Sequence, residues 1–191
     1  MSKTTKLPAK LAKYLEKAGI NHQILEHRTV YTAIDAANTL KRKMEEIAKS
    51  LLIKADKDYY LVLLPASHNL DFDKLTRCLK TQTKKEIKSV KIPGEKIMTE
   101  LLKIKQGALS AFGTLHKLPV VIDKELTKIK KVILSSGSFN HSVEMAMDDF
   151  VKMEKAMVGS FGVKKKFKVS KPKKKVKSEK LKTKSKKKNN K

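Results

Sequence analysis

The sequence predicts one compact α/β (α+β) domain, in which helices flank a mixed, partly antiparallel sheet of six or more strands. Short apolar runs typical of buried strands lie at 51–53, 59–64, 118–123 and 131–135. Segments with the apolar spacing of helices lie between them. From Gly159 onward apolar residues become isolated, and such a segment cannot bury enough surface to offset its ordering entropy. We therefore expect a folded domain over residues 1–158 and a disordered lysine-rich tail over 159–191.

Several helix ends can be read directly from the residues. Pro8 can open a first helix, which Gly19 closes. Thr32 followed by Asp35 has the spacing of an N-cap and its third helical residue, which predicts a helix over 33–40. Asp71 is expected to cap a later helix, and Asp148 the last one.

Residues 45–65 hold the feature on which the functional interpretation depends. Their two apolar runs flank a polar turn at 55–58 and predict a β-hairpin. Side chains alternate along a strand, so Lys49 shares a face with Leu51 and Ile53, which resemble core residues. Lys49 therefore either ends its strand at the solvent rim or faces a cavity. Position alone favours the rim.

A second unusual stretch is the 107–113 loop, whose residues are mostly small and all uncharged, and which is bounded by Gly107 and Gly113. Such a backbone can approach a ligand closely, and its N–H groups could bind an oxyanion. An ordinary surface loop is the alternative interpretation.

The charge distribution predicts a polyanionic partner. The formal net charge is +26, and residues 164–191 carry sixteen lysines against one glutamate, leaving +11 for residues 1–163. This balance favours nucleic acid as the partner, although lysine in the folded part could simply be solvating. The run at 171–177, KPKKKVK, resembles a nuclear-localisation signal, a pattern that arises easily in a lysine-rich tail.

Other classes of protein are disfavoured. Cys78 is the single cysteine, so no internal disulfide can form and a reducing compartment is expected. No apolar run reaches the roughly 18 residues of a membrane span, and we expect a cytoplasmic protein with no membrane partner. The five histidines form no zinc-like cluster, and His22 and His27 are expected to be surface or satisfied polar residues. GxGxxG, P-loop and GxSxG motifs are absent, and neither a metal nor a cofactor is expected.

The order of several blocks resembles that of a known family. The blocks are ILEHRTVYTAIDAA, EEIAKSLLIK, LVLLPASHNLDFDKL, GALSAFG, LPVVID and SGSFNHSVEM. Over about residues 5–157 this series resembles the YbaK/prolyl-tRNA-synthetase-associated aminoacyl-tRNA deacylases. The resemblance implies a free-standing editing domain that hydrolyses the ester of mischarged tRNA in trans. Its implied partners are tRNA and an aminoacyl-tRNA synthetase.

The resemblance also implies roles for particular residues. The family's functional lysine corresponds to Lys49, and its late glycine-bearing loop lies around Gly137, with Ser142 facing the pocket. Its glycine-rich substrate loop corresponds to Gly107, Ala108, Leu109, Ser110, Ala111, Phe112 and Gly113. Ala111 stands where the family usually has proline, so this loop lacks a fixed φ. The implied chemistry is that Lys49 and the loop hold the ester while a water or substrate hydroxyl attacks.

The tail is interpreted as a clamp on the tRNA backbone. The lysines expected to contact phosphates are Lys164, Lys165, Lys166, Lys173, Lys174 and Lys175. Two other hypotheses remain at this stage. One is a non-catalytic tRNA-binding or synthetase-associated module with the same fold. The other, a DNA- or chromatin-binding protein, rests on the tail alone.

Overall fold

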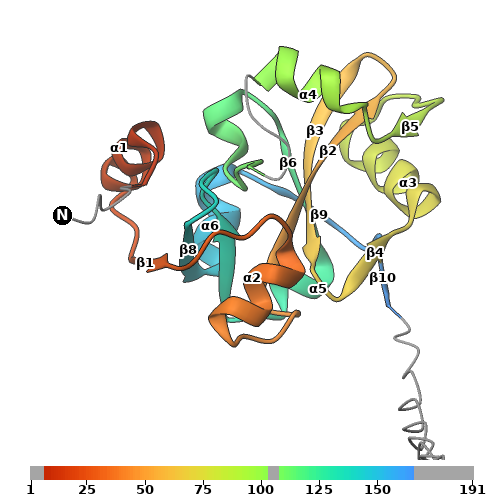
Figure 1. Cartoon of the computed structure of the whole chain (residues 1–191). Helices are drawn as coiled ribbons and strands as arrows, with labels where there is room; N and C mark the ends of the chain where they lie inside the picture. The colour runs from red at the N-terminus through yellow and green to blue at the C-terminus, as the bar shows by residue number, and fades with distance from the viewer. Residues whose placement is uncertain (1–6, 103–107, 166–191) are drawn as a thin grey trace, which may run out of the picture.

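A computed structural model describes residues 7–102 and 108–165, and it confirms the predicted mixed α+β domain (Figure 1). The helical elements are α1 (Ala9–Ala18), α2 (Ala33–Leu40), α3 (Phe72–Thr83), α4 (Glu95–Leu102), the 3-10 turn η1 (Gly113–His116), α5 (Lys124–Thr127) and α6 (Met147–Glu154). The strands are β1 (His22–Glu26), β2 (Ala48–Ala55), β3 (Asp58–Pro65), β4 (His68–Leu70), β5 (Val90–Lys91), β6 (Val120–Asp123), β7 (Lys131–Ser135), β8 (His141–Ala146), β9 (Met157–Gly159) and β10 (Gly162–Lys164).

The central sheet has five strands in the order β5-β2-β3-β6-β9. Strands β2 and β3 form the predicted antiparallel hairpin, with Lys49 opposite Leu64 in the register. Strand β6 runs parallel to β3, and β9 runs parallel to β6, so the sheet is mixed. At the hairpin turn Asp56 adopts a left-handed backbone with φ 51°. Its carboxylate accepts the N–H groups of Lys88 and Ser89, which brings β5 against the end of β2.

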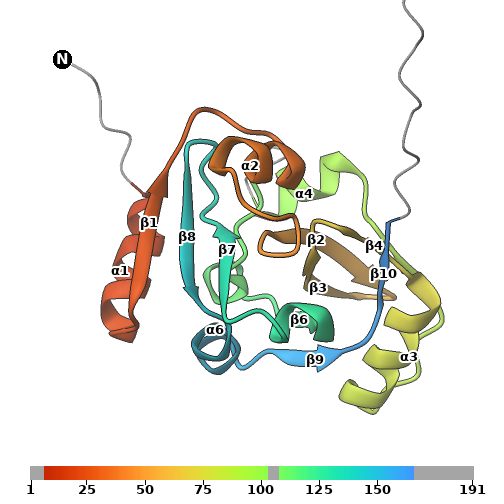
Figure 2. The same cartoon turned by 90° about the horizontal axis from the view of Figure 1, so that it is seen from below.

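Two layers cover the two faces of this sheet (Figure 2). The antiparallel sheet β1-β8-β7 packs on one face, and the isolated bridge between Ile47 and Ile133 joins it to the start of β2. Helix α3 and the pair β4–β10 lie on the other face. Two apolar clusters fill the spaces between the layers, one with Leu52 and Leu63 and the other with Ile53 and Leu64. Both faces of the hairpin are therefore buried, because alternate residues serve different cores.

Helix ends follow the predicted caps with one exception. Thr32 and Asp35 form a complete capping box at α2, and the Asp71 side chain accepts the N–H of Lys74 at α3. The prediction for Asp148 is wrong: α6 starts at Met147, directly after β8, and its N-cap is Ala146. Asp148 instead lies in the first helical turn, where its charge complements the helix dipole.

The folded part continues past the expected boundary at residue 158. Phe161 is fully buried, and β10 pairs with β4. The buried carboxylate of Asp123 accepts the N–H groups of Phe161 (2.7 Å) and Gly162 (2.6 Å). Apolar content underestimated this segment because one buried ring and one carboxylate suffice to attach it. Of the predicted tail, 159–191, residues 166–191 lie outside the described residues.

Within residues 7–102 and 108–165, no helix combines the length and apolar character needed to cross a bilayer.

Candidate active site

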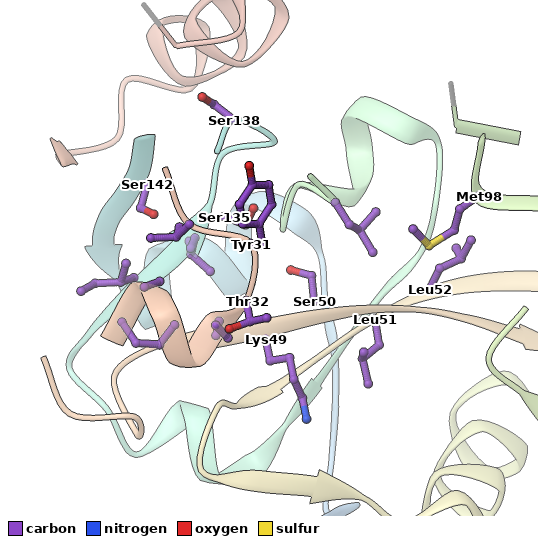
Figure 3. A pocket seen from close by; sticks show the side chains of 18 of the residues that line it. Tyr31, Thr32, Lys49, Ser50, Leu51, Leu52, Met98, Ser135, Ser138 and Ser142 are labelled. Atoms are coloured by element: carbon purple, nitrogen blue, oxygen red, sulfur yellow. The ribbon is translucent and has the colours of Figure 1, made fainter. Parts of the chain in front are cut away.

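A pocket of about 380 Å³ opens on the face of the central sheet that is covered by β1-β8-β7 (Figure 3). Its apolar wall comes from α2, β2, β7, α4 and the 107–113 loop, and includes Ala36, Leu52, Met98, Leu109 and Ile133. Its polar lining consists largely of hydroxyl groups, on Tyr31, Thr32, Ser50, Ser135, Ser138 and Ser142. A small apolar cavity with a few converging hydroxyls is typical of a small-molecule site.

Ser50 supplies a polar group that the protein does not use internally. Its side chain leaves β2 toward the pocket (Figure 3). The hydroxyl is buried, and within the described part of the chain it has no hydrogen-bond partner. Leaving a buried hydroxyl unpaired costs about 1–3 kcal/mol, which a bound ligand would recover. Ser50 is therefore a candidate ligand contact.

Lys49 lines the pocket, but Figure 3 shows its side chain leaving β2 on the side opposite to Ser50. Its ammonium donates to the carbonyl oxygen of His68 at 3.0 Å. Burial, and then the nearby charge of Lys165, lower the pKa of Lys49 to about 8. Neither of the two simple alternatives for Lys49 describes this position. The group is half-buried against β4 and next to a second lysine.

The described part of the 107–113 loop is tied to the end of β7. The N–H of Ala111 donates to the carbonyl oxygen of Ser135 at 2.9 Å. A proline at this position would lack that donor, so the hydrogen bond is one that Ala111 permits. Leu109 lines the pocket, and Ala111 and Phe112 are fully buried. Gly107 lies outside the described residues.

Gly137 and the described part of the 107–113 loop lie against each other. Gly137 has a positive φ of 86°, a conformation that favours glycine. A Cβ at this position would lie 3.5 Å from the carbonyl oxygen of Ala108 and 3.4 Å from the Cβ of Ser110. Thus the loop, Gly137 and Ser142 are brought to one end of β7 and β8.

Ser142 is a predicted pocket residue that lines the pocket and contacts a histidine. It lies in β8 opposite Ser135, and its hydroxyl is 3.0 Å from Nε2 of His27. The Nδ1 atom of His27 lies 2.9 Å from the carbonyl oxygen of Arg28. Both ring nitrogens of His27 therefore have a hydrogen-bond partner.

The lysines predicted to contact tRNA divide into two groups. Lys164 lies in β10 opposite His68, and the Lys165 ammonium donates to the carbonyl oxygen of Ala66 at 2.7 Å. Both therefore belong to the folded domain. The others, Lys166, Lys173, Lys174 and Lys175, lie outside the described residues.

Among the described residues, no group of three or more histidine, cysteine, aspartate or glutamate side chains is arranged to hold a metal ion.

Sequence reasoning did not single out Ser50. A signal was present in the sequence, because Ser50 directly precedes the apolar run 51–53 and alternation places its hydroxyl on the same face as Leu52. The connection between His27 and Ser142 had no comparable signal. The two residues are 115 positions apart, and only the pairing of β1 with β8 brings them together.

Both a family model and a curated protein are similar to this chain. A model of the aminoacyl-tRNA editing domain matches residues 27–153. The prolyl-tRNA editing protein ProX of Acetoanaerobium sticklandii is 27% identical over 153 residues, which cover 77% of this chain and 90% of that protein.

Two solved structures share the fold. The hypothetical protein APE2540 has a TM-score of 0.71 at 21% identity, over 81% of this chain and 99% of that one. A proposed trans-editing enzyme for prolyl tRNA synthetase has a TM-score of 0.69 at 21% identity, over 84% of this chain and all of that one. Because the editing-domain model matches more than half of the chain, this protein belongs to the aminoacyl-tRNA editing domain family.

Proposed function

We propose that this protein is a deacylase that hydrolyses the aminoacyl ester of mischarged tRNA in trans. The observation that carries the proposal is the hydroxyl-lined pocket with the unpaired Ser50, which lies within the region matched by the editing domain. The pocket would hold the aminoacyl group, and the side chain of that amino acid would lie against Leu52 and Ile133.

The geometry suits an ester that is already activated. Hydrolysis of such an ester requires positioning and stabilisation of the developing oxyanion more than a strong nucleophile. Among the described residues, no partner accepts the backbone N–H groups of Leu109 and Ser110, whereas that of Ala111 is used by Ser135. Of these two residues only Leu109 lines the pocket, so its N–H group is the candidate for holding the ester carbonyl oxygen.

Lys49 would act on the substrate from the other face of β2. Strand β5 pairs with β2 only at Lys54 and Ala55, so β5 leaves the edge of β2 at Lys49 unpaired. An ammonium has three N–H donors, and His68 takes one of them. We assign the other two to substrate oxygens, most simply those of a phosphate at the 3′ end of tRNA.

The similarity to the prolyl-tRNA editing protein ProX suggests the tRNA for proline, charged with a wrong amino acid, as the substrate. The net charge of +26 favours binding of the tRNA backbone. A prolyl-tRNA synthetase is the corresponding candidate partner, and the cytoplasm is the corresponding compartment.

The test is deacylation of a panel of tRNAs that carry alanine, cysteine, serine or threonine. Wild type should release at least one amino acid faster than the uncatalysed rate. Ser50→Ala should lower kcat/KM for that substrate by about tenfold, the effect of losing one ligand hydrogen bond of about 1.4 kcal/mol.

The matched control is Ser89→Ala, which removes an exposed hydroxyl outside the pocket and should leave kcat/KM unchanged. If wild type cleaves none of the esters yet binds tRNA, the non-catalytic alternative replaces the proposal.

The lysine-rich C-terminal segment gives a separate prediction. Removal of residues 166–191, which carry fourteen lysines and one glutamate, should raise the KM for tRNA by about tenfold at low salt. The slope of log KM against log salt should also become less steep, because fewer counterions are released. Steady-state deacylation between 50 and 200 mM salt measures both effects.

A chain of the same length with these lysines changed to glutamine serves as the control, since it separates charge from length. Equal KM values and slopes for all three proteins would show that this segment does not bind the substrate tRNA.

A further inference from the structure

A hydrogen-bonded chain leads from the pocket to an imidazole that does not line it. Ser142 lines the pocket and is 6% exposed. Its Oγ lies 3.0 Å from Nε2 of His27, and Nδ1 of His27 lies 2.9 Å from the carbonyl oxygen of Arg28. Figure 3 shows the Ser142 hydroxyl directed toward the pocket interior.

The second contact determines the direction of the first. A carbonyl oxygen can only accept a hydrogen bond, so Nδ1 of His27 carries a proton and donates a hydrogen bond to the carbonyl oxygen of Arg28. In the neutral imidazole Nε2 is then the acceptor, and Ser142 donates to it. The lone pairs of the Ser142 oxygen remain available toward the pocket.

The backbone holds both residues in place. Ser142 lies between Leu25 of β1 and Ser135 of β7 in the two antiparallel registers. The N–H of His27 donates to the carbonyl oxygen of Asn140 at 2.9 Å, which continues the β1–β8 pairing beyond the strand. Strand pairing therefore fixes both backbones and brings the two side chains within hydrogen-bond distance, the reach that proton transfer requires.

We propose that Ser142 and His27 form the proton relay that activates the attacking oxygen in the deacylation reaction. This inference rests on the proposed function. A water, or a free hydroxyl of the substrate, would donate to the Ser142 oxygen while Ser142 donates to Nε2 of His27. The arrangement follows the general pattern of a hydroxyl, a base and an orienting group.

The protons and bonds balance in two steps. When water attacks the ester carbonyl carbon, its proton passes to the Ser142 oxygen and the Ser142 proton passes to Nε2. When the tetrahedral intermediate collapses, the bond to the tRNA oxygen breaks, and the proton returns through Ser142 to that leaving oxygen. The products are the free amino acid and tRNA with a free hydroxyl, and the relay is restored. When the attacking group is a substrate hydroxyl, the same transfers hold, and the acyl group moves to that oxygen before water releases it.

The experiment compares single-turnover deacylation by full-length wild type, His27→Ala, His27→Gln and Ser142→Ala. The three substitutions should each lower the maximal rate by about 100-fold with little change in the substrate concentration at half-maximal rate, because general base catalysis contributes roughly 10²–10⁴-fold. Added imidazole should restore part of the rate of His27→Ala but none of that of Ser142→Ala.

His22→Ala is the matched control. His22 is a half-buried histidine of β1 whose Nδ1 also lies near a backbone carbonyl, that of Ile20, but it does not line the pocket. Its rate should equal that of wild type. Thermal melts of all variants verify that they are folded.

Three results would overturn the relay: full activity of His27→Gln, rate losses without imidazole rescue, or an acyl group trapped on Ser142, which would make the serine a nucleophile. In each of these cases wild type still cleaves aminoacyl-tRNA, so the proposed function stands. Inactivity of wild type on every ester removes the relay together with the proposed function.

Discussion

Replacing Lys49 by alanine is expected to lower kcat/KM for deacylation by about 100-fold while leaving the fold intact. The reason is that the half-buried ammonium is the candidate group for holding substrate oxygens, and it is aimed by the carbonyl oxygen of His68. Alanine is readily accommodated because the side chain forms no part of the two apolar clusters. Deacylation kinetics and a thermal melt check the two halves of the prediction.

Lys54→Ala is the matched control, since Lys54 is half-buried in the same strand and lies over the ring of Tyr59, outside the pocket. Its activity should match that of wild type. Undiminished activity of Lys49→Ala would remove Lys49 from the mechanism.

The pH dependence follows from the same geometry. The pKa of Lys49 is lowered to about 8, first by burial and then by Lys165, so the group is charged below pH 8 and neutral above it. If the charged form binds substrate, KM should rise as the pH passes through 8. Lys165→Gln removes the neighbouring charge and should move this midpoint to higher pH. If the pH midpoint of KM did not move, the charged Lys49 would not be the group that binds the substrate.

The same shift affects stability with a defined sign. Between pH 8 and about 10.5 the unfolded chain holds the Lys49 proton more tightly than the folded chain does. The contribution of Lys49 to the free energy of unfolding therefore increases with pH over that window.

Gly113→Ala is expected to destabilise the fold by about 3 kcal/mol, because the added methyl group overlaps neighbouring atoms. A Cβ at Gly113 would lie 2.4 Å from Cγ2 of Val120 and 2.5 Å from the carbonyl oxygen of Leu118. The second contact is with backbone, which the N–H of Leu118 ties to the carbonyl of Gly113 itself, so it cannot move aside cheaply. For a domain of this size, Tm should fall by about 10 °C.

Gly94→Ala provides the comparison, because a Cβ there meets no atom within 4 Å. Its Tm should stay within a few degrees of that of wild type. Equal melting temperatures for the two variants would show that Gly113 is not required for close packing.

The elements that the sequence predicted well are those set by local interactions. Pro8 and Gly19 bound α1, and Thr32 with Asp35 caps α2, because each of these signals acts within a few residues. The hairpin of β2 and β3 is likewise contained in one continuous stretch. The end of the domain was missed since Phe161 and Gly162 are fixed by Asp123, about forty positions away.

Of the residues that the family resemblance proposed for the site, Lys49, Leu109 and Ser142 line the pocket, whereas Gly137 does not. The tertiary structure decided on which face each group lies. Alternation along β2 was predicted correctly, but only the placement of β1-β8-β7 on one face of the sheet and α3 on the other shows that Ser50, not Lys49, points into the pocket. The pairing of β1 with β8 likewise connects His27 to Ser142. The period of a strand is a local property, whereas the layer that covers each face depends on contacts between distant parts of the chain.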